Sequence, residues 1–339
     1  MGLRKTIHSF FFYICGKYRY LWVLYLVRAA VHVFAGIAPS VSFLLFTHFD
    51  PNLIRKRIPI ILNPRYVHTQ GFFNEDFRVN INDHIGWHMY VYGYFDVTVP
   101  ALGLLMAPLM PGATFLDVEA NIGSSSIALA KHGIPVVAIE ASAHVASELL
   151  ANVALNSPMP FTVIPMAVTT PEQATAQSYA DIFSPQGNVA ASSLLKNWNP
   201  SKSAARIEKT QLTTLDRVVH LTQISKISVV KLDIEGYETE ALQGMVEIFK
   251  NPPMVVFEWR PELMRKSRGV VPDIRSFFPS SYQFFGLIAN VNNKNIALHL
   301  SSFDISKPCP TVLALPDSYI EQFHEIEQFA KTKNINVAT

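Results

Sequence analysis

The stretch FLDVEANIGSSSIALA, residues 115–130, decides the fold of this chain. It begins as an apolar strand that ends at Asp117, and a tight loop through Gly123 follows. Serines 124–126 come next, and serine is a residue type that caps helix N-termini well. Backbone N–H groups point out of a helix N-terminus, so a strand, a glycine-bearing loop and a helix start together predict a site for a nucleotide-like ligand.

A second apolar strand follows about twenty residues later, at 134–139, and it ends on Glu140. An acid at the tip of the second strand is the usual partner of ribose hydroxyl groups. Residues 115–140 therefore predict the first half of a nucleotide-binding sheet.

From residue 114 onward the sequence alternates predicted strands and helices. This alternation predicts an α/β, Rossmann-like fold with a mostly parallel, seven-stranded sheet and helices on both faces. Strands are expected at 114–118, 135–139, 161–165, 227–233 and 254–258, and near 282–288 and 311–314. Helices are expected at 96–110, after Glu140, from 213–216 onward, at 237–249 and near 273–278.

The remaining segments define the predicted domain organisation. Residues 1–64 are an apolar, basic N-terminal extension and linker, and residues 65–316 are the α/β domain, which begins with short strands or loops at 65–94. Residues 171–212 lose periodicity and predict an insertion over one edge of the sheet. Residues 317–339 are expected to form a C-terminal tail helix.

The N-terminal extension carries eight basic residues before residue 58 and a single acid, Asp50. An uncharged apolar run at 29–49 approaches the length of a membrane span. Two interpretations stay open. The segment is either an apolar helical appendage that packs on the domain, or a basic, aromatic element that brings residues 1–58 to a membrane surface.

Composition limits the classes of function. Charged residues make up 16% of the chain and apolar residues 49%, so the chain can bury a large core. The formal net charge of +2 gives no support to a nucleic-acid partner, and none is predicted. Cys15 and Cys309 are too far apart to suggest a disulfide framework or a zinc site, and the histidines are scattered. We therefore predict no metal and a cytoplasmic location, with peripheral attachment to a membrane left open.

Four acids fall at the predicted carboxyl ends of strands, where open parallel sheets bind ligands: Asp117, Glu140, Asp233 and Glu258. A second cluster is KLDIEGYE, residues 231–238. Because side chains alternate along a strand, Lys231, Asp233 and Glu235 are expected on one side. These acids can serve as a general base or as anchors for an acceptor, or Asp233 can form a strand-end salt bridge with Lys231.

These motifs, taken in order, resemble the FkbM-type methyltransferases. They are DVxANIG from Asp117, the acid of the second strand, ASSL at 191–194, TLD at 214–216, KxDxEGxE at 231–238, and the acid of the fifth strand. The resemblance covers roughly residues 86–316. It implies a class I, S-adenosylmethionine-dependent enzyme that O-methylates a hydroxyl group of a sugar, a glycan or a related metabolite.

The resemblance also implies roles for individual residues. The methionine end of the cofactor is held by Asp117, Glu119, Ala120, Asn121 and Gly123. Glu140 binds the ribose, and Ala167 borders the adenine. Asp233 and Glu235 face the methyl group and the acceptor, so Asp233 is expected to contact the cofactor as well. Expected acceptor-binding residues are Ser192, Ser193, Lys231 and Glu258.

One position departs from the family pattern, because Glu119 stands where the family has glycine. Glycine lets the backbone approach the cofactor closely, whereas a glutamate side chain there can crowd the cofactor or repel its carboxylate. An alternative function is therefore a non-catalytic, methyltransferase-like binding domain with impaired cofactor binding. A dehydrogenase is disfavoured, because the three-glycine fingerprint is missing. The expected partner is a small-molecule or glycan acceptor, and the sequence does not predict an oligomeric state.

Overall fold

The computed structural model describes residues 66–81, 83–156, 160–185, 191–196, 204–292, 295–320 and 335–336. The described residues fall into two compact units, one made of 66–72 and 76–95 and one made of 73–75 and the residues from 96 onward. The two interpretations of residues 1–58 lie outside the described residues, as does most of the expected tail helix at 317–339. Its described parts contradict that prediction, because they form a 3₁₀ turn at Asp317–Tyr319 and a strand at Ile335–Asn336 that pairs with another strand of the sheet. The boundaries at 64/65 and 316/317 stay predictions.

The smaller unit combines a hairpin with a helix. Strands β1 (Tyr66–Gln70) and β2 (Asp76–Asn80) pair antiparallel, and α5 (His84–Tyr92) follows them. Asp83 caps this helix by accepting a hydrogen bond from the Ile85 N–H at 3.2 Å. The sequence predicts only short strands or loops here, which is wrong for α5. Buried side chains occupy most of its length, so α5 lacks the polar stripe by which a surface helix is recognised.

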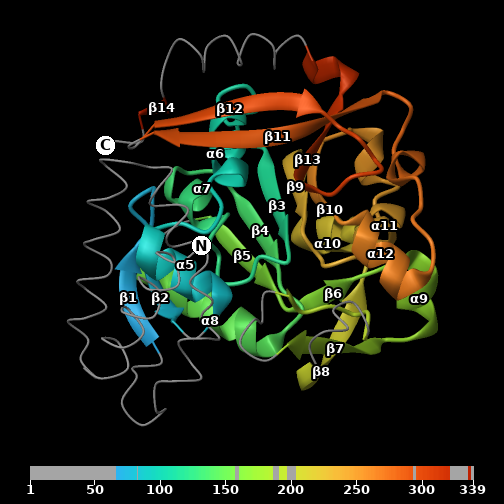
Figure 1. The fold of residues 1–339 in the computed structure, drawn as a ribbon, viewed down its shortest axis with the longest axis horizontal. Coiled ribbons are helices and arrows are strands. Elements are labelled where there is room, and N and C mark those ends of the chain that lie inside the picture. Colours follow the sequence, from blue (N-terminus) through green and yellow to red (C-terminus); the bar gives the residue numbers. More distant parts are fainter. Residues whose placement is uncertain are drawn as a thin grey trace, which may run out of the picture. The chain divides into compact units, whose positions relative to one another are not determined.

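The larger unit is built on a sheet with the strand order β14-β12-β11-β13-β10-β9-β3-β4-β5 (Figure 1). Five neighbouring strands are parallel: β5 (Phe161–Ile164), β4 (Val136–Ile139), β3 (Thr114–Val118), β9 (Ile227–Leu232) and β10 (Met254–Trp259). The antiparallel strands are β13 (Cys309–Pro316), β11 (Tyr282–Asn292), β12 (Asn295–Ser302) and β14 (Ile335–Asn336). The predicted α/β, mostly parallel fold is confirmed, but the predicted count of seven strands is wrong, because the described sheet also contains β12 and β14 and has nine strands.

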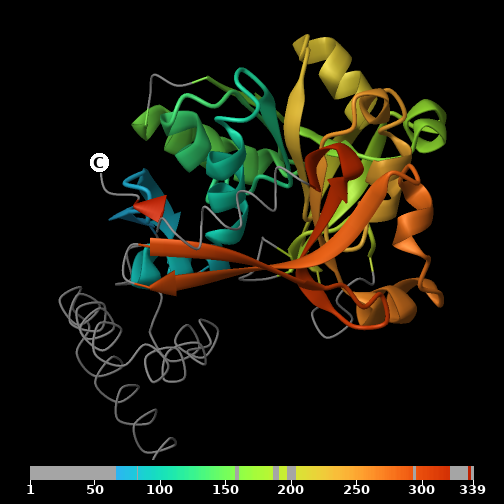
Figure 2. The same cartoon turned by 90° about the horizontal axis from the view of Figure 1, so that it is seen from above.

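Helices flank this sheet on both sides (Figures 1 and 2). They are α6 (Thr98–Met106), α7 (Ile127–Lys131), α8 (Ala143–Leu155), α10 (Leu215–Thr222), α11 (Glu238–Gln243) and α12 (Pro261–Arg268), with 3₁₀ turns η3 (Ile248–Lys250), η4 (Ile274–Phe277) and η5 (Asp317–Tyr319). All residues of β3 and β4 are buried, as expected for strands covered on both faces. Within the part of the chain that the structure describes, no helix has both the length and the apolar character required to cross a bilayer.

The segment predicted as an insertion contains regular structure. Helix α9 (Pro171–Ala176) precedes a hairpin of β7 (Tyr179–Pro185) and β8 (Ala204–Thr213). Strand β8 also pairs with β6 (Met166–Val168), so these strands form a separate three-stranded sheet in the order β6-β8-β7.

The helix predicted at 237–249 is shorter than expected, because α11 ends at Gln243. Gly244 packs closely, and a Cβ there would lie 3.0 Å from the Thr169 carbonyl oxygen. The Gly244 carbonyl accepts the Asp216 N–H at 2.9 Å, and the Asp216 carboxylate accepts the N–H groups of Glu247 and Ile248. These contacts use backbone groups that a continuous helix would pair internally.

Four further elements, α12, β6, β12 and β14, are absent from the sequence prediction. In addition, the predicted serine cap is wrong. Helix α7 begins at Ile127, and Ser126 makes no side-chain cap hydrogen bond. The Ser126 hydroxyl is buried without a hydrogen-bond partner among the described residues. Gly123 provides the turn instead, at φ 90°.

Candidate functional site

The loop after β3 is tied to the tip of β4 by the carboxylate of Glu140. This carboxylate accepts the Asn121 N–H at 2.9 Å through Oε2 and the Ser142 N–H at 2.9 Å through Oε1. The Ala120 N–H donates to the Ile139 carbonyl at 3.1 Å, and the Gly123 N–H donates to the Ala120 carbonyl at 2.9 Å. Four of the residues predicted to bind the cofactor therefore form one hydrogen-bonded unit.

Asp117 and Lys231 form a buried ion pair on the neighbouring strands β3 and β9. Lys231 Nζ lies 3.1 Å from Asp117 Oδ1 and 3.8 Å from Asp233 Oδ2, and it donates to the Glu119 carbonyl at 2.9 Å. Burial opposes the charge of Lys231, but the charges of Asp117 and Asp233 raise its pKa above the ordinary value. Lys231 thus makes a close contact with Asp117 as well as the longer one to Asp233 that the sequence allows.

Glu119 adopts a backbone conformation that favours glycine, with φ at 61°. This φ gives a second physical reason, besides close approach, for glycine at this position of the family. Burial raises the pKa of the Glu119 carboxyl well above its usual range, and the charges of Glu140, Asp233 and Glu235 add to this effect. The side chain therefore stands among acids of the site rather than away from them.

A cleft opens beside this loop. Four predicted site residues line it, namely Glu119, Ala167, Ser192 and Ser193. Its apolar wall includes Val118, Ile139, Met166, Val168 and Ile182, and Tyr237 closes one side. A mostly apolar cleft with a few polar groups is typical of a small-molecule site.

The two serines on the cleft are buried, and their hydroxyls contact the protein itself. Ser193 Oγ donates to the Glu235 carbonyl at 3.0 Å, and Ser192 Oγ donates to Ser184 Oγ at 2.8 Å. The role of Ser193 visible in the structure is therefore to hold the loop after β9.

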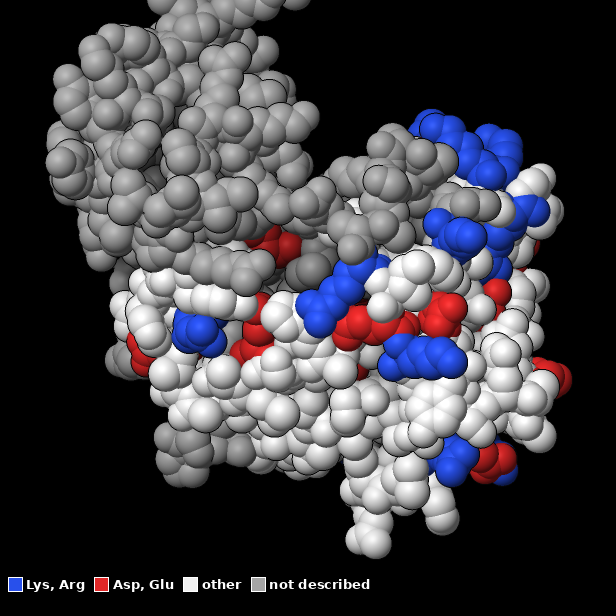
Figure 3. Space-filling model, turned by 90° about the horizontal axis from the view of Figure 1, so that it is seen from below, with Lys and Arg blue, Asp and Glu red and all other residues white. Residues whose placement is uncertain are grey.

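Asp233 directly follows β9, and Glu258 lies near the end of the adjacent parallel strand β10, where Leu232 pairs with Phe257. The Asp233 side chain is 45% exposed, whereas that of Glu258 is 20% exposed. Burial and the charge of Asp233 raise the pKa of Glu258 to about 7, and Arg260 Nη1 donates to its Oε1 at 3.1 Å. Figure 3, seen from below Figure 1, shows acidic side chains gathered near the middle of one face with basic side chains beside them.

One acid of the site, Asp96, is missed by the sequence analysis, and a second, Glu238, is part of the 231–238 cluster but its contacts are not predicted. Asp96 accepts the Thr98 N–H at 2.8 Å, and burial and the charge of Asp233 raise its pKa. Glu238 is 1% exposed, and its Oε1 accepts the N–H groups of Ile234 and Gly236 at 3.3 and 3.1 Å. The sequence places Glu238 only as a first-turn acid, because a hydrogen bond to the preceding loop cannot be read from helix position.

The pKa of Glu238 leads to a prediction about stability. Burial, together with the charges of Glu258 and Asp233, raises this pKa to about 8, against an ordinary value of 4.5. The folded state therefore binds more protons than the unfolded state between these values, so stability falls as the pH rises through this window. We expect the melting temperature of the ligand-free protein to fall by roughly 5 °C between pH 6 and pH 9.

The Glu238→Gln variant tests whether this carboxyl is responsible. A glutamine oxygen can still accept both loop N–H groups, and the variant has no charge to bury, so the fall in melting temperature should shrink. Glu247→Gln is the matched control, because Glu247 is 65% exposed and pairs only with Lys250 at the surface. Equal pH profiles for the parent and Glu238→Gln would contradict the assignment.

The site has features that fit S-adenosylmethionine. Asp117 is fully buried, and its Oδ2 has no hydrogen-bond partner among the described residues, so it can accept a hydrogen bond from the cofactor's amino group. Each Glu140 oxygen accepts one N–H and keeps a lone pair for a ribose hydroxyl. The excess of acids suits a cofactor with a positively charged sulfur. Among the described residues, no group of three or more His, Cys, Asp or Glu side chains could hold a metal ion.

Comparison with known proteins identifies the family of this region. The methyltransferase FkbM domain model matches residues 117–285. This range includes the loop after β3, the tip of β4 and the cluster after β9, which carry the predicted site. The match confirms the resemblance drawn from the sequence and gives S-adenosylmethionine as the cofactor. No curated protein sequence matches the chain.

Solved structures with a similar fold are distant in sequence. The tRNA (uracil-54, C5)-methyltransferase of Pyrococcus abyssi, in complex with S-adenosyl-L-homocysteine, is 12% identical at a TM-score of 0.35, and the match covers 74% of this chain and 44% of that one. The bifunctional kinase-methyltransferase WbdD is 11% identical at 0.38, covering 78% and 46%. Precorrin-6y C5,15-methyltransferase of Geobacter metallireducens GS-15 is 11% identical at 0.32, covering 66% and 92%. The chain thus spans less than half the length of the first two.

Proposed function

We propose, because residues 117–285 belong to the FkbM methyltransferase family, that this protein methylates a hydroxyl group of a sugar, a glycan or a related metabolite. The observation that carries the proposal is the Asp233 carboxylate. It is 45% exposed at the carboxyl end of β9, and the buried Lys231 ammonium lies 3.8 Å away. A partly exposed carboxylate beside a fixed cation is suited to accept a proton from a bound hydroxyl.

The chain's own residues would have separate roles in binding the cofactor and the acceptor. Asp117 and the loop of Ala120, Asn121 and Gly123 bind the methionine end of the cofactor, and Glu140 binds its ribose. When bound, S-adenosylmethionine supplies an electrophilic methyl group on a positively charged sulfur. Asp233 would hold the acceptor hydroxyl and take its proton as the hydroxyl oxygen bonds to the methyl carbon, whose bond to sulfur breaks to leave S-adenosylhomocysteine. The protein contributes mainly by positioning the two reactants, because the hydroxyl must lie in line with the methyl group.

Glu258 and Glu235 complete the acceptor side of this proposal. Glu258, with a pKa of about 7, lies on the strand next to the one that Asp233 follows, and it can accept the acceptor proton as an alternative to Asp233. Glu235 stands two residues beyond Asp233 in the loop and anchors a second hydroxyl of the acceptor. A sugar has several neighbouring hydroxyl groups, and these can donate hydrogen bonds to such a set of carboxylates.

The test is methyl transfer from methyl-labelled S-adenosylmethionine to a panel of acceptors. The panel contains free sugars, oligosaccharides and, as comparison compounds, amines and thiols of similar size. The proposal expects label in an ether of a sugar hydroxyl, identified by mass spectrometry of the product. Label found only in amine or thiol products would contradict O-methylation.

Glu119 supports a second candidate function, a binding domain in which cofactor binding is impaired. Its side chain lines the cleft, and its φ of 61° is unfavourable for a residue with a Cβ. We expect Glu119→Gly to lower the dissociation constant for S-adenosylhomocysteine by about tenfold, because like charge and steric crowding are removed together.

Gln223→Gly is the matched control for Glu119→Gly. Gln223 also has a positive φ, at 55°, but it ends α10 and does not line the cleft. Relief of backbone strain should stabilise both variants, whereas only Glu119→Gly should change affinity, as measured by calorimetric titration. Unchanged affinity in Glu119→Gly would remove Glu119 as an obstacle. Binding that appears only in this variant would favour the non-catalytic candidate.

A further inference from the structure

The loop between β9 and α11, residues 233–237, has an unusual backbone conformation. Glu235 has φ 49° and Gly236 has φ 95°, so two consecutive residues lie in the left-handed region. A non-glycine residue keeps such a conformation only where its surroundings impose it. The same loop carries Asp233 and Glu235, so whatever imposes its shape also sets the position of the proposed catalytic acids.

Two side chains hold the middle of this loop. Glu238 Oε1 accepts the N–H groups of Ile234 and Gly236, and Ser193 Oγ donates to the Glu235 carbonyl at 3.0 Å. These contacts satisfy both N–H groups and one carbonyl group of the loop. The carbonyl of Gly236 needs a donor from elsewhere, because the next helix begins only at Glu238.

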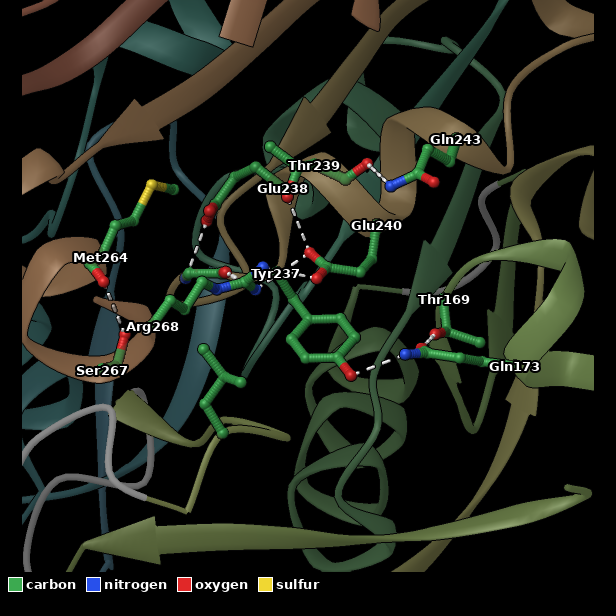
Figure 4. Close-up of polar contacts among 12 residues, drawn as sticks. Thr169, Gln173, Tyr237, Glu238, Thr239, Glu240, Gln243, Met264, Ser267 and Arg268 are labelled. Atoms are coloured by element: carbon green, nitrogen blue, oxygen red, sulfur yellow. Dashed lines mark hydrogen bonds and ion pairs between the residues drawn. The ribbon is translucent and has the colours of Figure 1, made fainter. Parts of the chain in front are cut away.

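That donor is Arg268, the last residue of α12 (Figure 4). Its Nη2 donates to the Gly236 carbonyl, and its guanidinium also pairs with Glu240, with Nη1 2.5 Å from Oε1 and Nη2 3.0 Å from Oε2. Arg268 Cζ lies 5.5 Å from the centre of the Tyr237 ring. One planar group therefore contacts the loop backbone, the first turn of α11 and the residue between them.

The far side of Tyr237 is also fixed. Its hydroxyl donates to Gln173 Oε1 of α9 at 3.4 Å, and the Thr169 hydroxyl donates to the same oxygen. Figure 4 shows the Tyr237 ring between this pair and Arg268. The end of the loop is thus held between α9 and α12. In the sequence, α9 precedes the cluster at 231–238 and α12 follows it.

The Arg268 contacts differ from an ordinary surface ion pair. The Arg268 side chain is 20% exposed, whereas Arg265 and Lys266 on the same helix are exposed residues. A guanidinium can bind a carboxylate and a carbonyl at once through its fork of N–H groups, which a lysine ammonium cannot reproduce in one plane.

We propose that Arg268 is a positioning residue that fixes loop 233–237 and so sets where Asp233 and Glu235 stand relative to the bound cofactor. The proposal that this position matters for turnover rests on the proposed methyltransferase function. The mechanical part, that Arg268 holds the loop, stands on the contacts alone. Arg268 itself touches no predicted cofactor-binding residue among the contacts that the structure shows, so its effect on the reaction passes through the loop.

The experiment compares the full chain with the variants Arg268→Lys and Arg268→Met, and with Arg265→Met as the matched control on the same helix. Hydrogen exchange is measured by mass spectrometry on peptides that cover 233–240 and, as an internal reference, on peptides that cover β3 and β4. Calorimetric titration with S-adenosylhomocysteine and methyl transfer are measured on the same samples.

We expect exchange in 233–240 to rise by about 10- to 100-fold in Arg268→Met, the size expected for losing a charged hydrogen bond, with β3 and β4 unchanged. Arg268→Lys should keep the charge but lose the fork, and should fall between the parent and Arg268→Met. Arg265→Met should match the parent. In Arg268→Met, affinity for S-adenosylhomocysteine should change less than threefold, whereas the turnover number should fall at least tenfold. A further variant, Arg268→Ala, should lose turnover similarly, and added guanidinium should restore part of it.

Other outcomes distinguish the role of Arg268 in holding the loop from the proposed methyltransferase function. Exchange in 233–240 that is equal in the parent and in Arg268→Met overturns the positioning role, whatever the protein catalyses. Exchange that rises together with that of β3 and β4 also overturns it, because Arg268 would then support the fold in general. A parent chain that neither binds S-adenosylhomocysteine nor transfers methyl groups overturns the proposed function, and the exchange result still decides the role of Arg268.

Discussion

We expect the Asp233→Asn variant to lose methyl transfer by about 10²- to 10⁴-fold, the usual contribution of a positioned general base. Asparagine keeps the size and a hydrogen-bonding oxygen, but it cannot take the acceptor's proton. Asp233 is 45% exposed and its contact to Lys231 is long, at 3.8 Å, while Lys231 keeps its closer partner Asp117. The fold and the affinity for S-adenosylhomocysteine should therefore be preserved.

Initial rates of label transfer at saturating acceptor measure this effect. Asp273→Asn is the matched control, because Asp273 is about half exposed and pairs with Arg275 at the surface. Full activity in Asp233→Asn would remove Asp233 from the mechanism and would move the search for a base to Glu258 on β10. Lost affinity for S-adenosylhomocysteine would instead place Asp233 in cofactor binding.

The second large effect is expected for Gly123→Ala, in the loop that follows β3. The new Cβ would lie 2.6 Å from Ile127 Cδ1 and 2.9 Å from Leu149 Cδ1, both in fully buried side chains, and φ is 90°. Strain of about 1–2 kcal/mol from the left-handed backbone adds to about 1–3 kcal/mol from overpacking. We expect unfolding free energy to fall by about 3–4 kcal/mol, with the affinity for S-adenosylhomocysteine at least tenfold weaker.

Gly133→Ala separates backbone strain from the clash. Gly133 has φ 80°, but no atom lies within 4 Å of a Cβ built there. This variant should lose only about 1–2 kcal/mol and keep its affinity, as measured by chemical denaturation and calorimetric titration. Equal losses in the two variants would mean that the contact of Gly123 with Ile127 and Leu149 does not shape the loop.

The parallel part of the sheet could be predicted because its strands are apolar on both faces and short. The strand predicted at 114–118 coincides with β3, and the helix predicted after Glu140, for which the sequence sets no bounds, is α8. The sequence does not predict helix α12 and strand β12 because their patterns are mixed: α12 holds four charged residues, and β12 has polar residues on both sides of its apolar ones.

The candidate site, like the fold, could be predicted from the sequence only in part. Position along the strands brings acids to one region, because parallel strands share an edge, and the charges of Glu140 and Asp233 contribute to the raised pKa of Glu119. What the sequence could not show is which acid pairs with Lys231, that Glu238 turns back to cap the preceding loop, or that Arg268 reaches this loop from α12. Each depends on tertiary contacts between residues whose spacing carries no signal.

Calorimetric titration of the full chain with S-adenosylhomocysteine tests the central claim most directly, because every proposed role depends on a cofactor held by the loop after β3 and by Glu140. We predict one site per chain with a dissociation constant on the order of micromolar, weakened in Gly123→Ala and strengthened in Glu119→Gly. If the folded parent chain and the Glu119→Gly variant both show no binding of S-adenosylhomocysteine, the assignment of this protein as a methyltransferase would be contradicted.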